Sequence, residues 1–298
     1  MQKKTDPMYR YRWANLQTLA ITGALAALLL LVGSLVLGRT GMILLGFVGA
    51  VSVWRASRMA GNLRPADARE LRYPEAPWLF DLVERLCASA PIASTPRIYF
   101  SASPMMNAMT FGSRQEPAIL VTAGLMNSLS EREVAGVLAH EVAHIQHNDL
   151  HLFRLAETVR AMTGFLSNVG WFSLFFFFPV MLMSGVAIPP GFIALLFGAP
   201  LVSVLLQLAL LRTREYAADA RAAVLTGDPL GLASALRTID QASSSPWRQL
   251  FGAAPAEQGG WLRTHPPTGE RVRRLMELSP RSAGGHSRAW WHYGEILT

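Results

Sequence analysis

The longest stretch without a charged side chain runs from Ala161 through Leu211, and it strongly limits what this chain can fold into. Pro189, Pro190 and Gly191 break the stretch, and a helix of about 20 residues, enough to cross a bilayer, fits on each side. We therefore predict a membrane hairpin; the alternative is a buried helix pair in a soluble domain. Composition favours the membrane, since 16% of the residues are charged against roughly 25% in soluble domains.

The N-terminal region holds two further apolar runs. Leu16–Leu37 lies in a segment without charged residues and is long enough to span a bilayer as a helix. Met42–Trp54 is shorter than the usual ~20 residues and needs its flanks in order to cross. A secretory signal peptide would also explain the first run, but this run is too long for the apolar part of such a peptide and no clear cleavage pattern follows. We predict two transmembrane helices.

Basic residues flank these two runs on their outer sides, and Arg39 is the only charged residue between them. The positive-inside rule therefore places both flanks in the cytoplasm and the short link outside. This distribution accounts for the net charge of +7 without nucleic acid, which we do not expect as a partner. Cys87 is the only cysteine, so no intrachain disulfide forms, which suits a polar domain in the reducing cytoplasm.

Between and after the apolar runs, the sequence alternates between helix and strand patterns. Pro77 begins an amphipathic helix, and "RIYF", "MNAMTF" and "AILVTAG" have the composition of short strands, with a hairpin loop over 112–117. Ser130 and Glu133 form a capping box, which predicts a helix running toward Arg160. Three later helices are expected over 212–225, from Asp228 through Asp240 and from Pro267 through Leu278.

The decapeptide "LAHEVAHIQH", at 138–147, carries the pattern H-E-x-x-H on the helix that the capping box predicts. Residues four apart share a helix face, so His140 and His144 can direct both imidazoles at one metal ion. Glu141 lies about 100° round the helix and can reach a water beside the metal. The spacing therefore predicts two zinc ligands and a general base. A satisfied pair of core or surface histidines is the alternative.

A catalytic zinc site usually has a third protein ligand. Asp149 is near in sequence, but on a continuing helix it lies more than a turn away and faces away from His140. Glu215 and Asp219 in "LRTREYAADA" share a helix face, so that Glu215 can bind metal and Asp219 can orient a ligand histidine. A solvated helix face paired with neighbouring arginines is an equally open interpretation. We interpret His147 as a residue behind the ligands or facing solvent.

In combination, three motifs make the sequence resemble the HtpX-like integral-membrane zinc metallopeptidases, gluzincins related to the CAAX prenyl endopeptidases. "LAHEVAHIQHND" resembles the active-site helix of that family, "TREYAADARA" its E-x-x-x-D helix and "RTHPPTGERVRRL" its C-terminal His-Pro-Pro element. The resemblance implies one Zn²⁺ per chain, bound by His140, His144 and Glu215, with Glu141 as the base and Asp219 behind the ligands. The tail after residue 280 has no counterpart that we can place.

The resemblance also implies roles for residues that spacing alone does not single out. His265 and Arg271 fall where the family places residues that face the catalytic cleft, where a donor can stabilise an oxyanion. "MMNAMTFG" resembles the strand beside that cleft, so Asn107 and Ala108 are expected to lie along a bound peptide. A proline-flanked turn, a surface arginine and an ordinary sheet strand are the corresponding structural interpretations.

We therefore expect a mainly α protein with a small β-sheet, a zincin-like metallopeptidase domain combined with about four transmembrane helices. The expected parts are a cytoplasmic tail (1–15), two transmembrane helices (16–54), the first part of the catalytic domain with the H-E-x-x-H helix (55–160), a membrane hairpin (161–211) and the second part of the catalytic domain with the third ligand (212–298).

The expected function is that of a zinc-dependent endopeptidase of the bacterial inner membrane, with its catalytic domain facing the cytoplasm. Its partners are the lipid bilayer and polypeptide substrates, and the resemblance implies quality control of misfolded or damaged membrane proteins. The alternative is a non-proteolytic scaffold or chaperone-like binder with a structural metal site, although such sites normally have four protein ligands. A proton-relaying transporter is disfavoured, because the segments flanking the H-E-x-x-H helix are too charged for a lipid-buried helix.

Overall fold

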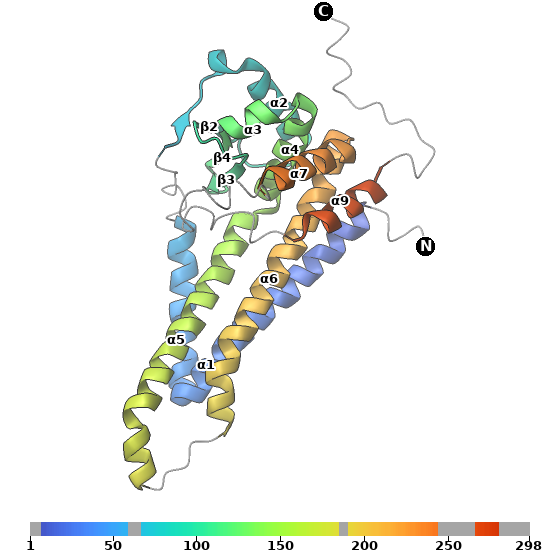
Figure 1. The fold of residues 1–298 in the computed structure, drawn as a ribbon. Helices are drawn as coiled ribbons and strands as arrows, with labels where there is room; N and C mark the ends of the chain where they lie inside the picture. The colour runs from blue at the N-terminus through green and yellow to red at the C-terminus, as the bar shows by residue number, and fades with distance from the viewer. Residues whose placement is uncertain (1–6, 59–66, 185–189, 244–265, 280–298) are drawn as a thin grey trace, which may run out of the picture. The chain divides into compact units, whose positions relative to one another are not determined.

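The computed structural model describes residues 7–58, 67–184, 190–243 and 266–279. The chain forms two compact units, which we describe separately. One unit consists of 16–58 and 151–211 and is helical, whereas the other comprises the remaining segments and carries the sheet and the site. Figure 1 shows the elements in both units.

In the helical unit, α1 (Pro7–Arg58) folds back on itself. Gly38 has a φ of 62°, a left-handed conformation that glycine adopts without strain, and the helix reverses direction there. A side chain at Gly49 would contact Leu29, so the two arms pack closely in antiparallel fashion (Figure 1). Among the described residues, Trp13–Ser34 is the one helical segment long and apolar enough to cross a membrane.

Two long helices, α5 (Asp149–Ser184) and α6 (Pro190–Thr226), contribute the rest of this unit through residues 151–184 and 190–211. A small apolar cluster joins α1, α5 and α6 through Leu25, Val159 and Leu210, together with Ala156. The predicted membrane hairpin over 161–211 falls on α5 and α6, and its turn at 185–189 lies outside the described residues. Its crossing of a bilayer stays a prediction. The helix expected over 212–225 is wrong as a separate element, because α6 continues from the apolar segment into it without a break.

The other unit contains a four-stranded sheet in the order β1-β2-β4-β3. The three predicted strands are confirmed as β2 (Arg97–Ser101), β3 (Ala108–Gly112) and β4 (Pro117–Thr122), and a two-residue strand, β1 (Arg69–Glu70), was not predicted. β2 runs parallel to β4, whereas β3 and β4 form the expected antiparallel hairpin. Gly112 has a φ of 93° at the hairpin turn, where a side chain would collide with the Glu116 carbonyl.

Strand β3 presents its two faces to different neighbours. Ala108 belongs to the main hydrophobic core, which it shares with α4 (Glu131–His147) and α2 (Pro77–Ala88). Phe111 and Met109 belong to a second cluster with Tyr99 and Leu120. Since side chains alternate along a strand, Thr110 lies on the same face as Ala108 and points toward α4. One polar side chain of β3 is thereby directed at the helix that carries the H-E-x-x-H motif.

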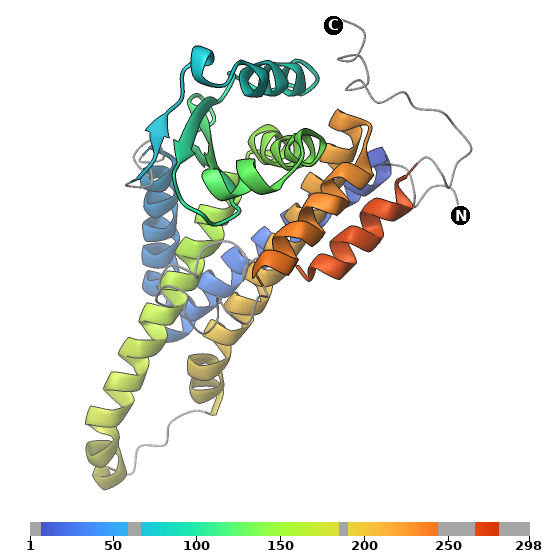
Figure 2. The same cartoon turned by 45° about the horizontal axis from the view of Figure 1, so that its top comes forward.

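Helix α4 packs against α2 on one side and against a later helix of the chain on another. A 3-10 helix, η3 (Tyr73–Glu75), precedes α2, and α3 (Ala123–Ser128) follows β4. On the other side of α4 lies α7 (Pro229–Ser243), which packs beside α9 (Thr268–Glu277), as Figure 2 shows in orange and red. The predicted helix beginnings at Pro77, Asp228–Pro229 and Pro267 agree with these bounds to within a residue.

Helix α4 begins as the sequence predicts and ends earlier. The Ser130 hydroxyl accepts from the Glu133 amide while the Glu133 carboxylate accepts from the Ser130 amide, which confirms the capping box. The expectation of one helix through to Arg160 is wrong. Asn148 adopts a left-handed conformation with a φ of 56°, and its amide closes the last turn of α4 on the carbonyls of His144 and Ile145. The next helix, α5, begins at Asp149.

Candidate metal centre

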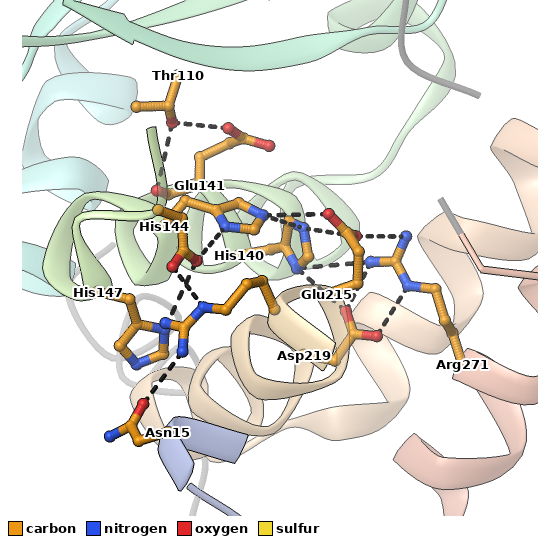
Figure 3. Close-up of polar contacts among 11 residues, drawn as sticks. Asn15, Thr110, His140, Glu141, His144, His147, Glu215, Asp219 and Arg271 are labelled. Carbon is orange, nitrogen blue, oxygen red and sulfur yellow. Dashed lines mark hydrogen bonds and ion pairs between the residues drawn. The ribbon is translucent and has the colours of Figure 1, made fainter. Parts of the chain in front are cut away.

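Three side chains from two helices converge on one point in the sheet-containing unit. His140 and His144 come from α4 and Glu215 from α6, all are buried, and one ligand atom of each lies within 4.8 Å of the others. The two Nε2 atoms are 3.0 Å apart, and each lies 3.5 Å from an oxygen of Glu215 (Figure 3). These residues can therefore hold one metal ion.

An aspartate and an arginine lie behind the first histidine. Nδ1 of His140 is 3.0 Å from Oδ1 of Asp219, which comes from α6 one turn beyond Glu215. Arg271, from α9, donates two hydrogen bonds to the Asp219 carboxylate over 2.8 and 2.6 Å, and its Nη1 lies 3.3 Å from Glu215. Burial raises the pKa of Asp219, but the charge and hydrogen bonds of Arg271 and of His140 outweigh it and lower the pKa to about 2.

A matching pair lies behind the second histidine. Nδ1 of His144 is 2.7 Å from Oδ2 of Asp149, and the other oxygen of Asp149 accepts from Nε of Arg214 over 2.5 Å. Arg214 also donates to Asn15 over 3.1 Å. Asp149 lies outside the three-residue metal group, as expected, but the helix does not continue past Asn148, and Asp149 therefore lies against His144. Asn148 was the signal for the break, since asparagine adopts the left-handed conformation more readily than most residues.

The hydrogen bonds behind the histidines test whether the site fits a metal. A carboxylate only accepts, so each histidine donates its Nδ1 proton, which leaves the two Nε2 atoms facing one another beside Glu215, where a metal ion can take the place of a proton. Burial lowers the pKa of His144, but hydrogen bonds with Asp149 and Glu215 raise it to about 10. The cluster thus attracts positive charge, and two imidazoles with one carboxylate form a typical donor set for catalytic zinc.

Glu141 lies beside this group and is held on one side only. It is buried, and its Oε2 accepts a hydrogen bond of 2.7 Å from Oγ1 of Thr110. Among the described residues, its Oε1 has no hydrogen-bond partner. A buried carboxylate oxygen without a partner is costly in a folded protein, which marks this atom as a candidate for chemistry.

The structure separates the other candidates. His265 lies outside the described residues. Arg271 is buried against Asp219 and Glu215, so its interpretation as a surface arginine is wrong. His147 does not belong to the three-residue metal group, and its side chain is buried with Nδ1 3.9 Å from Asp149, which excludes a solvent-facing ring. Burial lowers the pKa of His147 to about 4.

The interpretation of Glu215 and Asp219 as a solvated helix face is wrong, since both are buried. Asn107 lies just before β3, and its backbone makes two hydrogen bonds with Thr122. The backbone N–H of Asn107 donates to Oγ1 of Thr122, and the backbone carbonyl of Asn107 accepts from the backbone N–H of Thr122. Its side-chain Oδ1 is buried and has no hydrogen-bond partner among the described residues. Ala108 packs into the core.

The donor set on α4 and α6, beside a partly engaged glutamate, is that of a zinc metallopeptidase of the H-E-x-x-H class. Residues 74–279 match the model of "Peptidase family M48". Curated relatives are each described as "Protease HtpX homolog". One, from Persephonella marina, is 34% identical over 290 residues, covering 90% of this chain and 98% of its own length. The chain belongs to peptidase family M48.

Other relatives carry the same description. The protein from Ralstonia nicotianae is 35% identical, with 90% of this chain and 97% of its own length covered. That from Salinibacter ruber is 36% identical, with 89% and 98% covered. The crystal structure of S. mikatae Ste24p aligns with a TM-score of 0.45 and 22% identity over 86% of this chain and 62% of that one. The protein is a membrane zinc metallopeptidase, and the non-proteolytic scaffold is not favoured.

Proposed function

We propose that His140, His144 and Glu215 hold the zinc ion and that Glu141 is the general base of peptide hydrolysis. One observation carries the assignment. Asp219 and Asp149 orient the imidazoles of His140 and His144, so that both Nε2 atoms face Glu215. Zinc bound there would lower the pKa of a water and polarise a peptide carbonyl. With these three protein ligands, a bound zinc ion would keep a coordination position for water, as is typical of catalytic zinc sites.

The protein's own groups supply the proton transfers. Glu141 takes the proton of the attacking water on Oε1, which has no other partner among the described residues, and delivers it to the leaving amine. Asp219 and Asp149 hold the imidazoles, and Arg271 and Arg214 hold those aspartates. We assign Arg271 this orienting role from its contacts. His265 stays a candidate oxyanion donor on the strength of the family resemblance alone.

Strand β3 is the proposed place for the substrate backbone. It is the terminal strand of the described sheet, with β4 on one side, and a terminal strand can pair with an extended peptide through main-chain hydrogen bonds. Ala108 is its first residue and Asn107 immediately precedes it. We propose that they line the bound peptide, with the Asn107 amide side chain, whose Oδ1 has no partner in the described structure, as a polar contact.

We further propose that the substrates are misfolded or damaged membrane proteins of the bacterial inner membrane and that the active site faces the cytoplasm. The description of the relatives as HtpX homologues supports the quality-control role. The basic residues on the outer sides of the two N-terminal apolar runs support the orientation by the positive-inside rule.

The test compares wild type with Glu141→Gln in detergent, by zinc analysis and cleavage of an unfolded casein-type substrate. Wild type should carry about one zinc per chain and cleave in a chelator-sensitive manner. The Gln variant should retain zinc, because its ligands are unchanged, and lose turnover. Cleavage at the wild-type rate by Glu141→Gln would show that this residue is not the base.

A further inference from the structure

A threonine from the neighbouring strand engages the proposed base. Oγ1 of Thr110 donates to Oε2 of Glu141 over 2.7 Å and also lies 3.3 Å from the Glu141 carbonyl oxygen. Both side chains are buried, and Figure 3 shows the hydroxyl turned toward the carboxylate. In the described part of the chain, both acceptors that Oγ1 of Thr110 contacts therefore belong to Glu141.

Thr110 lies buried on the core-facing side of β3. On the same face of β3, Ala108 packs into the core that includes Val137, Leu138 and Val142 of α4. A valine of the same shape would fill this position, and burying a hydroxyl is unfavourable unless it is hydrogen-bonded. The carboxylate of Glu141 accepts the hydrogen bond of this hydroxyl, so the polar group of Thr110 acts on Glu141.

The contact restricts how Glu141 can act. With Oε2 held by Thr110, the carboxylate has one defined orientation, and Oε1 is the oxygen left without a partner among the described residues. A general base works only within hydrogen-bond reach of the proton that it removes. A misplacement of about 1 Å in an active site can reduce the rate about 100-fold.

We propose that Thr110 is a positioning residue, whose hydroxyl orients Glu141 for proton transfer through Oε1. The inference rests on the proposed role of Glu141 and deepens it. Because Thr110 lies two residues after Ala108, the strand proposed to bind the substrate also carries the group that orients the base. Substrate placement and base placement are thereby coupled through β3.

The test uses two pairs of side chains that differ in a hydroxyl at nearly constant volume. Thr110→Val compares with wild type, and Thr110→Ala compares with Thr110→Ser. Rates are measured per zinc-loaded chain, with kcat and KM determined separately. We expect the Val and Ala variants to lose roughly 10- to 100-fold in kcat, with KM changed less than about twofold and zinc retained. Thr110→Ser should stay within about threefold of wild type.

A purely structural role predicts another order. Activity would then follow side-chain volume, so that Val matches wild type while Ser and Ala fall together, and this result would overturn the proposal. If the Val variant does not fold, the difference in kcat between Thr110→Ser and Thr110→Ala tests the proposal by itself. Thr226→Val is the control, since it removes a buried hydroxyl that bonds the Ala222 carbonyl away from Glu141, and its kcat should be unchanged. Suppose that Glu141→Gln is inactive while the kcat of the Thr110 variants does not depend on the hydroxyl. This result would refute the role of Thr110 and leave the proposed role of Glu141 intact.

Discussion

Nε of Arg214 lies 2.5 Å from Oδ1 of Asp149, and neither side chain is more than 2% exposed. The other oxygen of the same carboxylate holds His144, so an arginine of α6 fixes a histidine of α4 through one aspartate. On the opposite side of the site, Arg271 fixes His140 through Asp219 in the same manner. The two proposed imidazole ligands are thus each oriented by an aspartate and arginine pair.

Asp149→Asn should weaken zinc binding. The amide can still contact His144, but it loses the charge that favours the Nδ1–H tautomer and pairs with Arg214. Loss of such a partner typically costs about 10- to 100-fold in metal affinity. Competition with a chromophoric chelator measures this change. Asp228→Asn is the matched control, because Asp228 pairs with Arg132 away from the metal group, and its variant should bind zinc like wild type. Equal affinities for the two variants would contradict the prediction.

Arg271→Met should lower stability strongly. It removes the bidentate partner of Asp219 and leaves a buried carboxylate unpaired, a change that costs about 3–5 kcal/mol. The thermal midpoint of the purified protein in detergent measures the loss. Arg273→Met on the same helix is the control, since Arg273 is exposed and pairs with Glu277 at the surface, so its midpoint should hardly move. Similar midpoints for both variants would argue against a structural Arg271–Asp219 pair.

Asn148→Gly should preserve the site, whereas Asn148→Val should damage it. The residue has a φ of 56°, which glycine adopts freely and a β-branched residue resists. Strain at this position would extend or distort the end of α4 and displace Asp149 from His144. Zinc content and thermal midpoint together report the effect. A Val variant with normal zinc content and stability would show that the left-handed turn is dispensable.

Cys87 should be unreactive in the folded protein. Burial raises the pKa of its thiol from 9.0 to about 12, with a smaller contribution from the charge of Glu84, so the thiolate is scarce at pH 8. Because the folded pKa is raised, this thiol's contribution to stability is complete below pH 9 and falls as the pH rises from about 9 to about 12. Alkylation with iodoacetamide, followed by mass spectrometry, should be slow in native protein and fast in denaturant. Rapid native labelling at pH 8 would contradict the buried position.

Local sequence determined the elements that depend on near neighbours. The capping box of Ser130 and Glu133 and the i, i+4 spacing of His140 and His144 act within a few residues, so they specified the helix and its ligand pair in advance. The short strands and the hairpin at Gly112 were likewise predictable, because turn residues and β-forming runs are local signals.

Tertiary structure decided how distant segments complete the site. From the sequence, Glu215 could be a metal ligand or part of a solvated helix face. Its burial beside the histidines of α4 excludes the solvated face. The break at Asn148 turned Asp149 toward His144, and one β3 side chain, Thr110, reached Glu141. Such contacts depend on how α6, α9 and β3 pack against α4, and packing is a property of the whole core that no local pattern contains.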